Sequence, residues 1–157
     1  MNSNAATLSA QHAAEAELVT FYVGDLLLGA EISQVEEINR HIEMTPVPHA
    51  PESVRGVVNL RGEVVTVLDL RTILGLGRTA ADRNTRNVIV NTAGTRTGLL
   101  VDRIADVVNV RWNEIDLPPA NLSGVQGRFL LGVYKLENEL LSVLDVSEVL
   151  ASADVAS

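Results

Sequence analysis

The sequence predicts a mainly β protein, an all-β barrel or sandwich built from two copies of one unit. Short apolar runs alternate with turn residues, and hardly any stretch has the pattern of a long helix. An internal repeat supports the duplication: residues 130–150 superpose on residues 54–74 at an offset of about 76 without a gap. An earlier match places Gly29 on Gly98 at an offset of about 69. The two offsets differ because the connections 39–53 and 108–129 differ in length.

Residues 1–38 precede the repeated segment 54–74. Residues 1–17 are rich in Ala, Ser, Asn and Gln with a single leucine, which predicts a disordered tail, with a nascent helix over 10–17 as the alternative. Residues 18–23 and 26–30 read as a hairpin around Gly24 and Asp25. The next apolar residues recur every third position, which fits one helical turn or a twisted strand with a bulge; they are Ile32, Val35 and Ile38.

Residues 45–71 carry the clearest pattern of secondary structure in the sequence. Three prolines give a rigid lead-in, and two apolar runs then flank Arg61-Gly62, which predicts a β-hairpin. Asp69 is placed to cap a short helix over residues 70–76, with Gly75 or Gly77 ending it.

The second copy is expected to repeat this order. Its expected elements are a loop at 78–86, strands at 87–91, 97–101 and 107–110, and a last helix at 146–151. Asp145, with Glu148 three residues later, forms a start like a capping box for that helix. Residues 113–129 are the longest candidate loop, a kind of segment that is usually functional or mobile. We expect one domain over 18–150, with interleaved units 18–86 and 87–150, and a C-terminal tail at 151–157.

Composition excludes several classes of function. The 157 residues carry a formal net charge of -8 and five aromatic side chains, which disfavours binding to nucleic acid or to an anionic membrane surface. The absence of cysteine excludes disulfides and thiolate chemistry. The start lacks the pattern of a secretory signal, and no apolar run is long enough to span a bilayer. We expect a soluble, cytoplasmic protein without membrane insertion.

The sequence offers little for catalysis. The histidines, His12, His41 and His49, are isolated, so we expect no metal site, and no glycine-rich phosphate cradle or nucleophile elbow is present, so we expect no cofactor and no catalytic residue. Asp69 and Asp145 could be paired carboxylates, but the repeat puts both at helix starts, which favours capping.

Arg61 is the sharpest polar difference between the copies, because Glu137 takes the equivalent position. One interpretation is an exposed turn residue beside a glycine with positive φ. The other is a planar cation on a rigid tip that grips carboxylates or carbonyls of a partner. Glu36 and Glu37 form an adjacent pair on an extended segment, so one of them is expected to point outward, as solvated charge or as a partner contact beside Arg61.

Three motifs together resemble the signature of CheW, the family of chemotaxis coupling proteins. They are Pro46-Val47-Pro48-His49-Ala50-Pro51, Gly56-Val57-Val58-Asn59-Leu60-Arg61-Gly62 and Val67-Leu68-Asp69-Leu70-Arg71, with Val35-Glu36-Glu37-Ile38 before them and Gly98-Leu99-Leu100-Val101-Asp102 after them. The resemblance covers residues 18–150. With no receiver or kinase segment beside it, the chain resembles the free-standing adaptor and not the CheV hybrid or the kinase CheA.

The resemblance implies two five-stranded SH3-like β-barrels around a common core, with short helices, and no enzymatic activity. It implies an adaptor that bridges the helical hairpin at the tip of methyl-accepting chemoreceptors to the CheW-like regulatory domain of CheA, in cytoplasmic arrays at the inner membrane. The receptor tip would dock between the barrels at seven residues: Val35, Glu37, Gly56, Arg61, Gly62, Gly98 and Val107. Kinase contacts would come from strands of the first barrel, and exposed barrel edges would permit ring assembly.

Thr66 takes a position where many members carry proline, which removes a marker of an edge strand. The rival functions are a barrel that binds a small molecule, and a scaffold of the same kind in a pilus-based or other non-flagellar chemosensory pathway.

Overall fold

The computed structural model describes residues 15–40 and 43–153, and β-strands dominate this part of the chain. The first half holds β1 (Glu15–Val23), β2 (Leu26–Glu31), β3 (Val35–Arg40), β4 (Val54–Leu60), β5 (Glu63–Asp69) and the short helix α2 (Leu70–Ile73). The second half holds β6 (Arg86–Thr92), β7 (Thr95–Val101), β8 (Arg103–Arg111), β9 (Asn121–Leu122), β10 (Val125–Gln126), β11 (Leu130–Lys135), β12 (Leu140–Leu144) and α3 (Val146–Ser152). Three 3₁₀ turns complete the list: η1 (Ile32–Gln34), η2 (Trp112–Glu114) and η3 (Gly127–Phe129).

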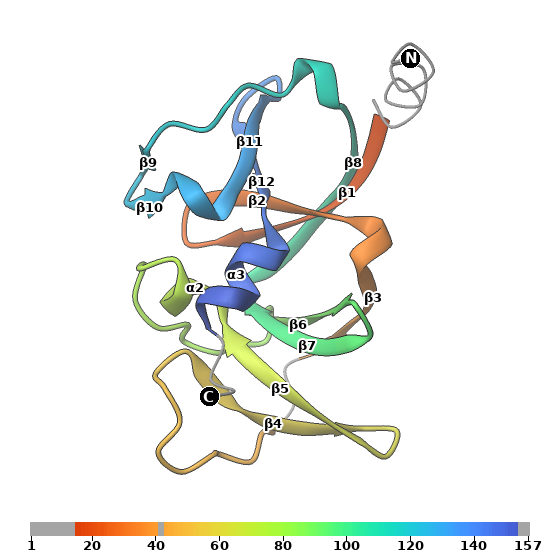
Figure 1. Cartoon of the computed structure of the whole chain (residues 1–157), viewed down its shortest axis with the longest axis vertical. Helices are drawn as coiled ribbons and strands as arrows, with labels where there is room; N and C mark the ends of the chain where they lie inside the picture. Colours follow the sequence, from red (N-terminus) through yellow and green to blue (C-terminus); the bar gives the residue numbers. More distant parts are fainter. Residues whose placement is uncertain (1–14, 41–42, 154–157) are drawn as a thin grey trace.

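Ten of the strands form two five-stranded sheets, one above the other in Figure 1. The first sheet has the order β11-β12-β2-β1-β8 and the second has the order β3-β6-β7-β5-β4. The hairpin of β1 and β2 therefore pairs with strands of the second half, and the hairpin of β6 and β7 pairs with strands of the first half. Each exchanged hairpin joins its sheet through one parallel pair, β12 with β2 and β5 with β7.

Backbone bridges close both sheets into barrels. Thr45, which follows β3, exchanges two hydrogen bonds of 2.9 Å with Val57 of β4. Asp116, which follows β8, makes the same exchange with Val133 of β11, again at 2.9 Å. Since β3 and β4 are the edges of the second sheet and β8 and β11 those of the first, the bridges join edge to edge. The predicted mainly β fold with two five-stranded units is confirmed.

Three apolar clusters stabilise the barrels. The first barrel encloses Leu18, Leu27, Val110, Leu141 and Val143. The second encloses Val58, Leu60, Val65, Val67, Ile89 and Leu100. The largest cluster lies between the sheets and takes in both helices; it includes Phe21, Leu28, Leu70, Val88, Leu99 and Val146. Figure 1 shows both helices between the two sheets. There they pack against a core that the two barrels share.

The continuous apolar runs of the sequence follow from this arrangement. Successive side chains of a strand point to opposite faces. On β6, Ile89 points into the second barrel, whereas its neighbours Val88 and Val90 point into the shared core. A strand with both faces buried has no place for alternating polar residues.

Both predicted aspartate caps are confirmed, but the capping box at Asp145 is not completed, because the N–H of Asp145 donates to the carbonyl oxygen of Phe129 at 2.8 Å. The Asp69 carboxylate accepts a hydrogen bond from the backbone N–H of Thr72 at 3.3 Å, and Asp145 accepts one from the N–H of Glu148 at 3.1 Å. The first helix is shorter than the expected 70–76, since α2 ends at Ile73 and Gly75 takes a φ of 80° that a helix cannot accommodate.

Other boundaries differ from expectation. Strand β1 begins at Glu15, so residues 15–17 pair with β8 instead of belonging to a tail, and residues 1–14 lie outside the described part. The ambiguous segment 32–38 contains both alternatives, a single turn (η1) followed by a bulged strand (β3). The expected loop 113–129 holds the small hairpin of β9 and β10, between parts of η2 and η3. Strand β5 lies between β7 and β4, so Thr66 is on an inner strand and marks no edge.

Candidate interaction surface

Arg61 and Gly62 form the tight turn between β4 and β5. Both have positive φ values, 52° and 88°, as a type I′ hairpin turn requires. The backbone N–H of Gly62 donates to Oδ1 of Asn59 at 2.8 Å, which fixes the start of the turn. The same bond recurs from Gly94 to Asn91 at 3.0 Å, and from Gly124 to Asn121 at 3.1 Å. The pattern Asn-x-x-Gly is thus a sequence signal for three of the hairpins.

The Arg61 side chain extends from this turn to Glu37 on β3. Its Nη1 and Nη2 atoms each donate to one carboxylate oxygen of Glu37, with 3.3 Å between Nη1 and Oε1. Hydrogen bonding to Arg61 holds the pKa of Glu37 below its ordinary value. The Arg61 side chain is still 68% exposed, whereas that of Glu37 is 23% exposed. The cation is therefore both anchored within the molecule and displayed to solvent.

A bulge in β3 explains how two adjacent glutamates serve one cluster. Val35 pairs with Val90 and Glu37 with Ile89, so Glu36 is an extra residue without a register partner. One member of the pair was expected to point outward, and the side chain of Glu36 is 37% exposed. The bulge also lets both carboxylates reach the same guanidinium, that of Arg96. Glu36 accepts hydrogen bonds from Nδ2 of Asn91 at 2.5 Å and from Arg96 at 2.9 Å.

Arg96 of β7 lies at the centre of these carboxylates. Its Nε is 2.9 Å from Glu36, its Nη2 is 3.7 Å from Glu37, and its Nη1 pairs with Glu63 at the start of β5. We call the five residues Glu36, Glu37, Arg61, Glu63 and Arg96 the charged cluster. It connects β3, β5, β7 and the β4–β5 turn at one end of the second barrel.

The remaining predicted site residues are spread more widely. Gly62 belongs to the turn described above, and Val35 packs against the shared core. Gly56 and Gly98 are buried, and a Cβ on Gly56 would lie 2.6 Å from the carbonyl oxygen of Thr45. Val107 is 55% exposed on β8 of the other sheet. The structure therefore brings Arg61, Gly62 and Glu37 together at one surface, with Val35 beside it in sequence.

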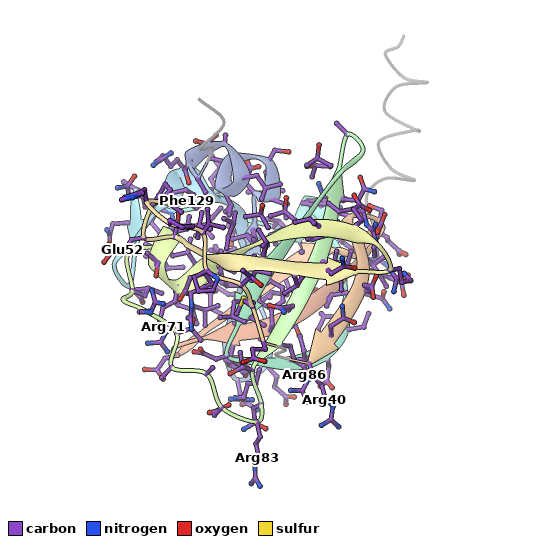
Figure 2. The ribbon with its side chains drawn as sticks, turned by 90° about the horizontal axis from the view of Figure 1, so that it is seen from below. Arg40, Glu52, Arg71, Arg83, Arg86 and Phe129 are labelled. Atoms are coloured by element: carbon purple, nitrogen blue, oxygen red, sulfur yellow. The ribbon has the colours of Figure 1, made fainter. Side chains whose placement is uncertain are left out.

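Other arginines lie at a separate place. Figure 2 shows Arg83 projecting into solvent, with Arg40 and Arg86 nearby. Arg40 and Arg86 are register partners at one end of the β3–β6 pair, and the charged cluster lies at the other end, where Val35 meets Val90.

The described residues contain no group of three or more His, Asp or Glu side chains that could hold a metal ion, and none of their helices is long and apolar enough to cross a membrane. His49 is exposed in the lead-in to β4, whereas His12 and His41 lie outside the described residues.

Comparison with known proteins decides the family, since the model of the CheW-like domain matches residues 17–154. The chain belongs to the CheW-like family. It is 34% identical to the chemotaxis protein CheW of Rhizobium meliloti, covering 88% of this chain and 89% of that one. It is 30% identical to chemotaxis protein CheW of Treponema pallidum, covering 88% of this chain and 84% of that one.

A solved CheW structure has the same fold. The crystal structure of the scaffolding protein TtCheW from Thermoanaerobacter tengcongensis matches with a TM-score of 0.77 at 28% identity, covering 83% of this chain and 84% of that one. This CheW-family chain is therefore a chemotaxis scaffold and not an enzyme. The sequence singled out Arg61 and Glu37, which the structure brings into contact. It gave no prediction for Arg96, although the offset of about 69 places Arg96 on Leu27, a polar difference as sharp as that at Arg61.

Proposed function

We propose that this chain couples methyl-accepting chemoreceptors to the histidine kinase CheA in cytoplasmic arrays at the inner membrane. One face would bind the helical hairpin of the receptor tip, and another would bind the CheW-like regulatory domain of the kinase. The observation that carries the receptor half of this proposal is the exposed Arg61–Glu37 pair on a rigid turn. Family membership supports the rest.

The Arg61–Glu37 pair has chemistry suited to a helix tip. A guanidinium has five N–H donors, and the fork to Glu37 uses two of them, so others are free for carbonyl or carboxylate oxygens of a partner. Glu37 and the type I′ turn already order the Arg61 side chain, so binding of a partner costs less conformational entropy. Val107 on β8 would extend this surface to the first barrel, and β3 and β8 lie on the same side of the molecule in Figure 1.

A scaffold of this kind would act through differential contacts and not through chemistry. A receptor state that binds the adaptor better shifts the assembly toward that state, and the kinase reads the shift. Barrels closed by edge-to-edge bridges suit this role, because a site held on strands keeps its geometry while the partners change theirs.

Substitution of Arg61 tests the receptor contact. Arg61→Glu should weaken association with the receptor and coupling to the kinase, while the circular dichroism spectrum and the Tm remain nearly intact. Arg61→Asn should have the same effect on association with an unchanged or higher Tm, because asparagine fits the positive φ of a type I′ turn better than arginine does. Arg83→Glu is the matched control: it makes the same charge change on an exposed arginine elsewhere and should bind as the wild type does.

Two outcomes would contradict this assignment. If Arg61→Glu unfolds while Arg61→Asn binds normally, Arg61 has a structural role alone. If both variants fold and couple normally, the receptor contacts a different surface. Purification of the chain from its native host, with mass spectrometry of the proteins that accompany it, tests the partners themselves: a methyl-accepting receptor and a kinase with a related regulatory domain should appear together.

A second candidate is the same scaffold in a pathway with a different output. The chain is 33% identical to Protein FrzA of Myxococcus xanthus, over 93% of this chain and 92% of that one, which is as similar as the proteins named CheW. Deletion of the gene, followed by separate assays of swimming and of surface motility, distinguishes the two outputs.

A further inference from the structure

We propose that Arg96 is a positioning residue, which holds Glu36 and Glu63 away from Arg61 so that Arg61 pairs with Glu37 alone. The inference rests on the proposed function, because it concerns how the receptor-binding pair acquires its geometry. Three carboxylates share one end of the second barrel, and each is within reach of a guanidinium.

The contacts of Arg96 divide the carboxylates between two cations. Nε of Arg96 takes Glu36 at 2.9 Å, and Nη1 takes Glu63, so both of these glutamates have a partner on β7. The weaker contact to Glu37, 3.7 Å from Nη2, leaves both oxygens of that carboxylate to the fork of Arg61. Arg96 is the less exposed of the two arginines, at 17% against 68%, so its ion pairs are screened less by solvent.

The partner elements keep Arg96 itself in place. Asn91 of β6 donates to the second oxygen of Glu36, which orients that carboxylate toward Nε of Arg96. The bulge at Glu36 supplies the extra residue that brings this carboxylate to the same side as Glu37. A planar guanidinium can meet three carboxylates from three directions, whereas an ammonium is a single point of charge.

The first barrel shows that the fold does not require this arginine. At an offset of about 69, Arg96 falls on Leu27, which is buried in the first barrel. The equivalents of Glu37 and Arg61 there are Asp106 and Glu137, two acidic residues that cannot form an ion pair. The arginine at this position and the ion pair beside it thus occur in the same barrel, and a leucine fills the position in the other barrel.

The charges of the cluster explain what removal of Arg96 would do. Its charged groups are Glu36 and Glu37 on β3, Arg61 in the turn, Glu63 on β5 and Arg96 on β7, with the polar Asn91 on β6. Without Arg96, three carboxylates would compete for the single guanidinium of Arg61. The charge of Arg96 also contributes to the lowered pKa of Glu37, after the larger contributions of Arg61 and of a hydrogen bond with Asn39.

The test compares Arg96→Leu with Arg96→Lys and with Arg83→Leu, which removes the same charge from an exposed loop. Carboxyl NMR titration should show the pKa of Glu37 rising toward its ordinary value in Arg96→Leu, less so in Arg96→Lys, and not in Arg83→Leu. Side-chain relaxation of Arg61 should report a more mobile guanidinium in Arg96→Leu. Receptor affinity should fall about two- to fivefold, which is the size of effect expected if the exposed Arg61–Glu37 ion pair loses its fixed geometry. In an Arg61→Asn background, Arg96→Leu should have no further effect on affinity.

The NMR readouts need no receptor, so the two ideas can fail separately. If the pKa of Glu37 and the mobility of Arg61 are unchanged in a folded Arg96→Leu variant, Arg96 does not position the pair. An additional loss of affinity in the Arg61→Asn background would also overturn the proposal, because Arg96 would then contact the partner directly. If the NMR changes appear but neither Arg61→Glu nor Arg61→Asn weakens receptor binding, positioning by Arg96 stands and the proposed receptor contact fails.

Discussion

Arg55 and Asp69 form an ion pair inside the protein, with Nη1 of Arg55 2.9 Å from Oδ2 of Asp69. The Asp69 carboxylate is fully buried and accepts further hydrogen bonds from the backbone N–H and the hydroxyl of Thr79, at 2.9 and 2.8 Å. In the second copy, Leu131 stands in place of the arginine, and Asp145 is a partly exposed helix cap. Two aspartates that the repeat makes equivalent therefore have different energetic roles.

Truncation of the two aspartates should separate these roles. Asp69→Ala removes a cap and leaves the guanidinium of Arg55 without its buried ion-pair partner. This should lower the free energy of unfolding by about 3 kcal/mol. Asp145→Ala removes the cap alone and should cost about 1 kcal/mol. Urea denaturation of both variants measures the difference, and equal losses would show that the Arg55 pair adds nothing beyond capping.

The stability should also depend on pH through Asp69. Burial by itself would raise the pKa of Asp69, but hydrogen bonds from Thr79, Arg55 and Thr72 outweigh burial and hold the pKa below its ordinary value of 3.8. A carboxyl whose pKa is lower in the folded state adds stability above its unfolded pKa and loses it as the pH falls through the folded pKa. The free-energy difference between the wild type and Asp69→Asn should thus be constant above about pH 5 and shrink below about pH 4.

Urea midpoints between neutral pH and about pH 2.5 check this expectation. Asp145→Asn is the matched control, since it makes the same substitution at the equivalent helix start and asparagine is also a good cap. A difference for Asp69→Asn that stays constant into the acid range would mean that Asp69 titrates alike in the folded and unfolded states.

Gly56 should be intolerant of any side chain. Its φ is 153°, and a Cβ would lie 2.6 Å from the carbonyl oxygen of Thr45, which takes part in the bridge that closes the second barrel. We expect Gly56→Ala to lower the free energy of unfolding by about 3 kcal/mol. Gly62→Ala is the control, because its positive φ is strained by a Cβ but no atom lies within 4 Å, so about 1 kcal/mol is expected. Similar losses would show that φ and not the contact with Thr45 determines the cost.

The exchange of hairpins predicts that neither half of the chain folds alone. A fragment of residues 1–86 holds β3, β4 and β5 without the β6–β7 hairpin between them, and its own β1–β2 hairpin lacks β8 and β12. We expect both this fragment and residues 87–157 to show no cooperative thermal transition, and a mixture of the two to regain the strand signal in circular dichroism. A cooperative transition in one fragment would contradict this.

Local features of this protein were determined by the sequence. The repeat of residues 54–74 in residues 130–150, the Asn-x-x-Gly hairpins and the capping roles of Asp69 and Asp145 each depend on neighbours within a few positions, or on comparison of one copy with the other. Turn geometry and helix caps are satisfied by nearby backbone groups, so residue type and spacing are enough to predict them.

The tertiary structure alone decided which hairpin joins which sheet. The β1–β2 hairpin precedes β3, β4 and β5 in the sequence, yet it pairs with strands of the other half. The sequence does not show this exchange, because the pattern of apolar residues fits either partner. The charged cluster as a whole could not be predicted from the sequence either. Glu36, Glu37, Glu63 and Arg96 lie up to 60 residues apart and meet only when a bulged strand and a closed barrel bring them together. Pairings between distant strands depend on the packing of the whole chain, which no local pattern of residues records.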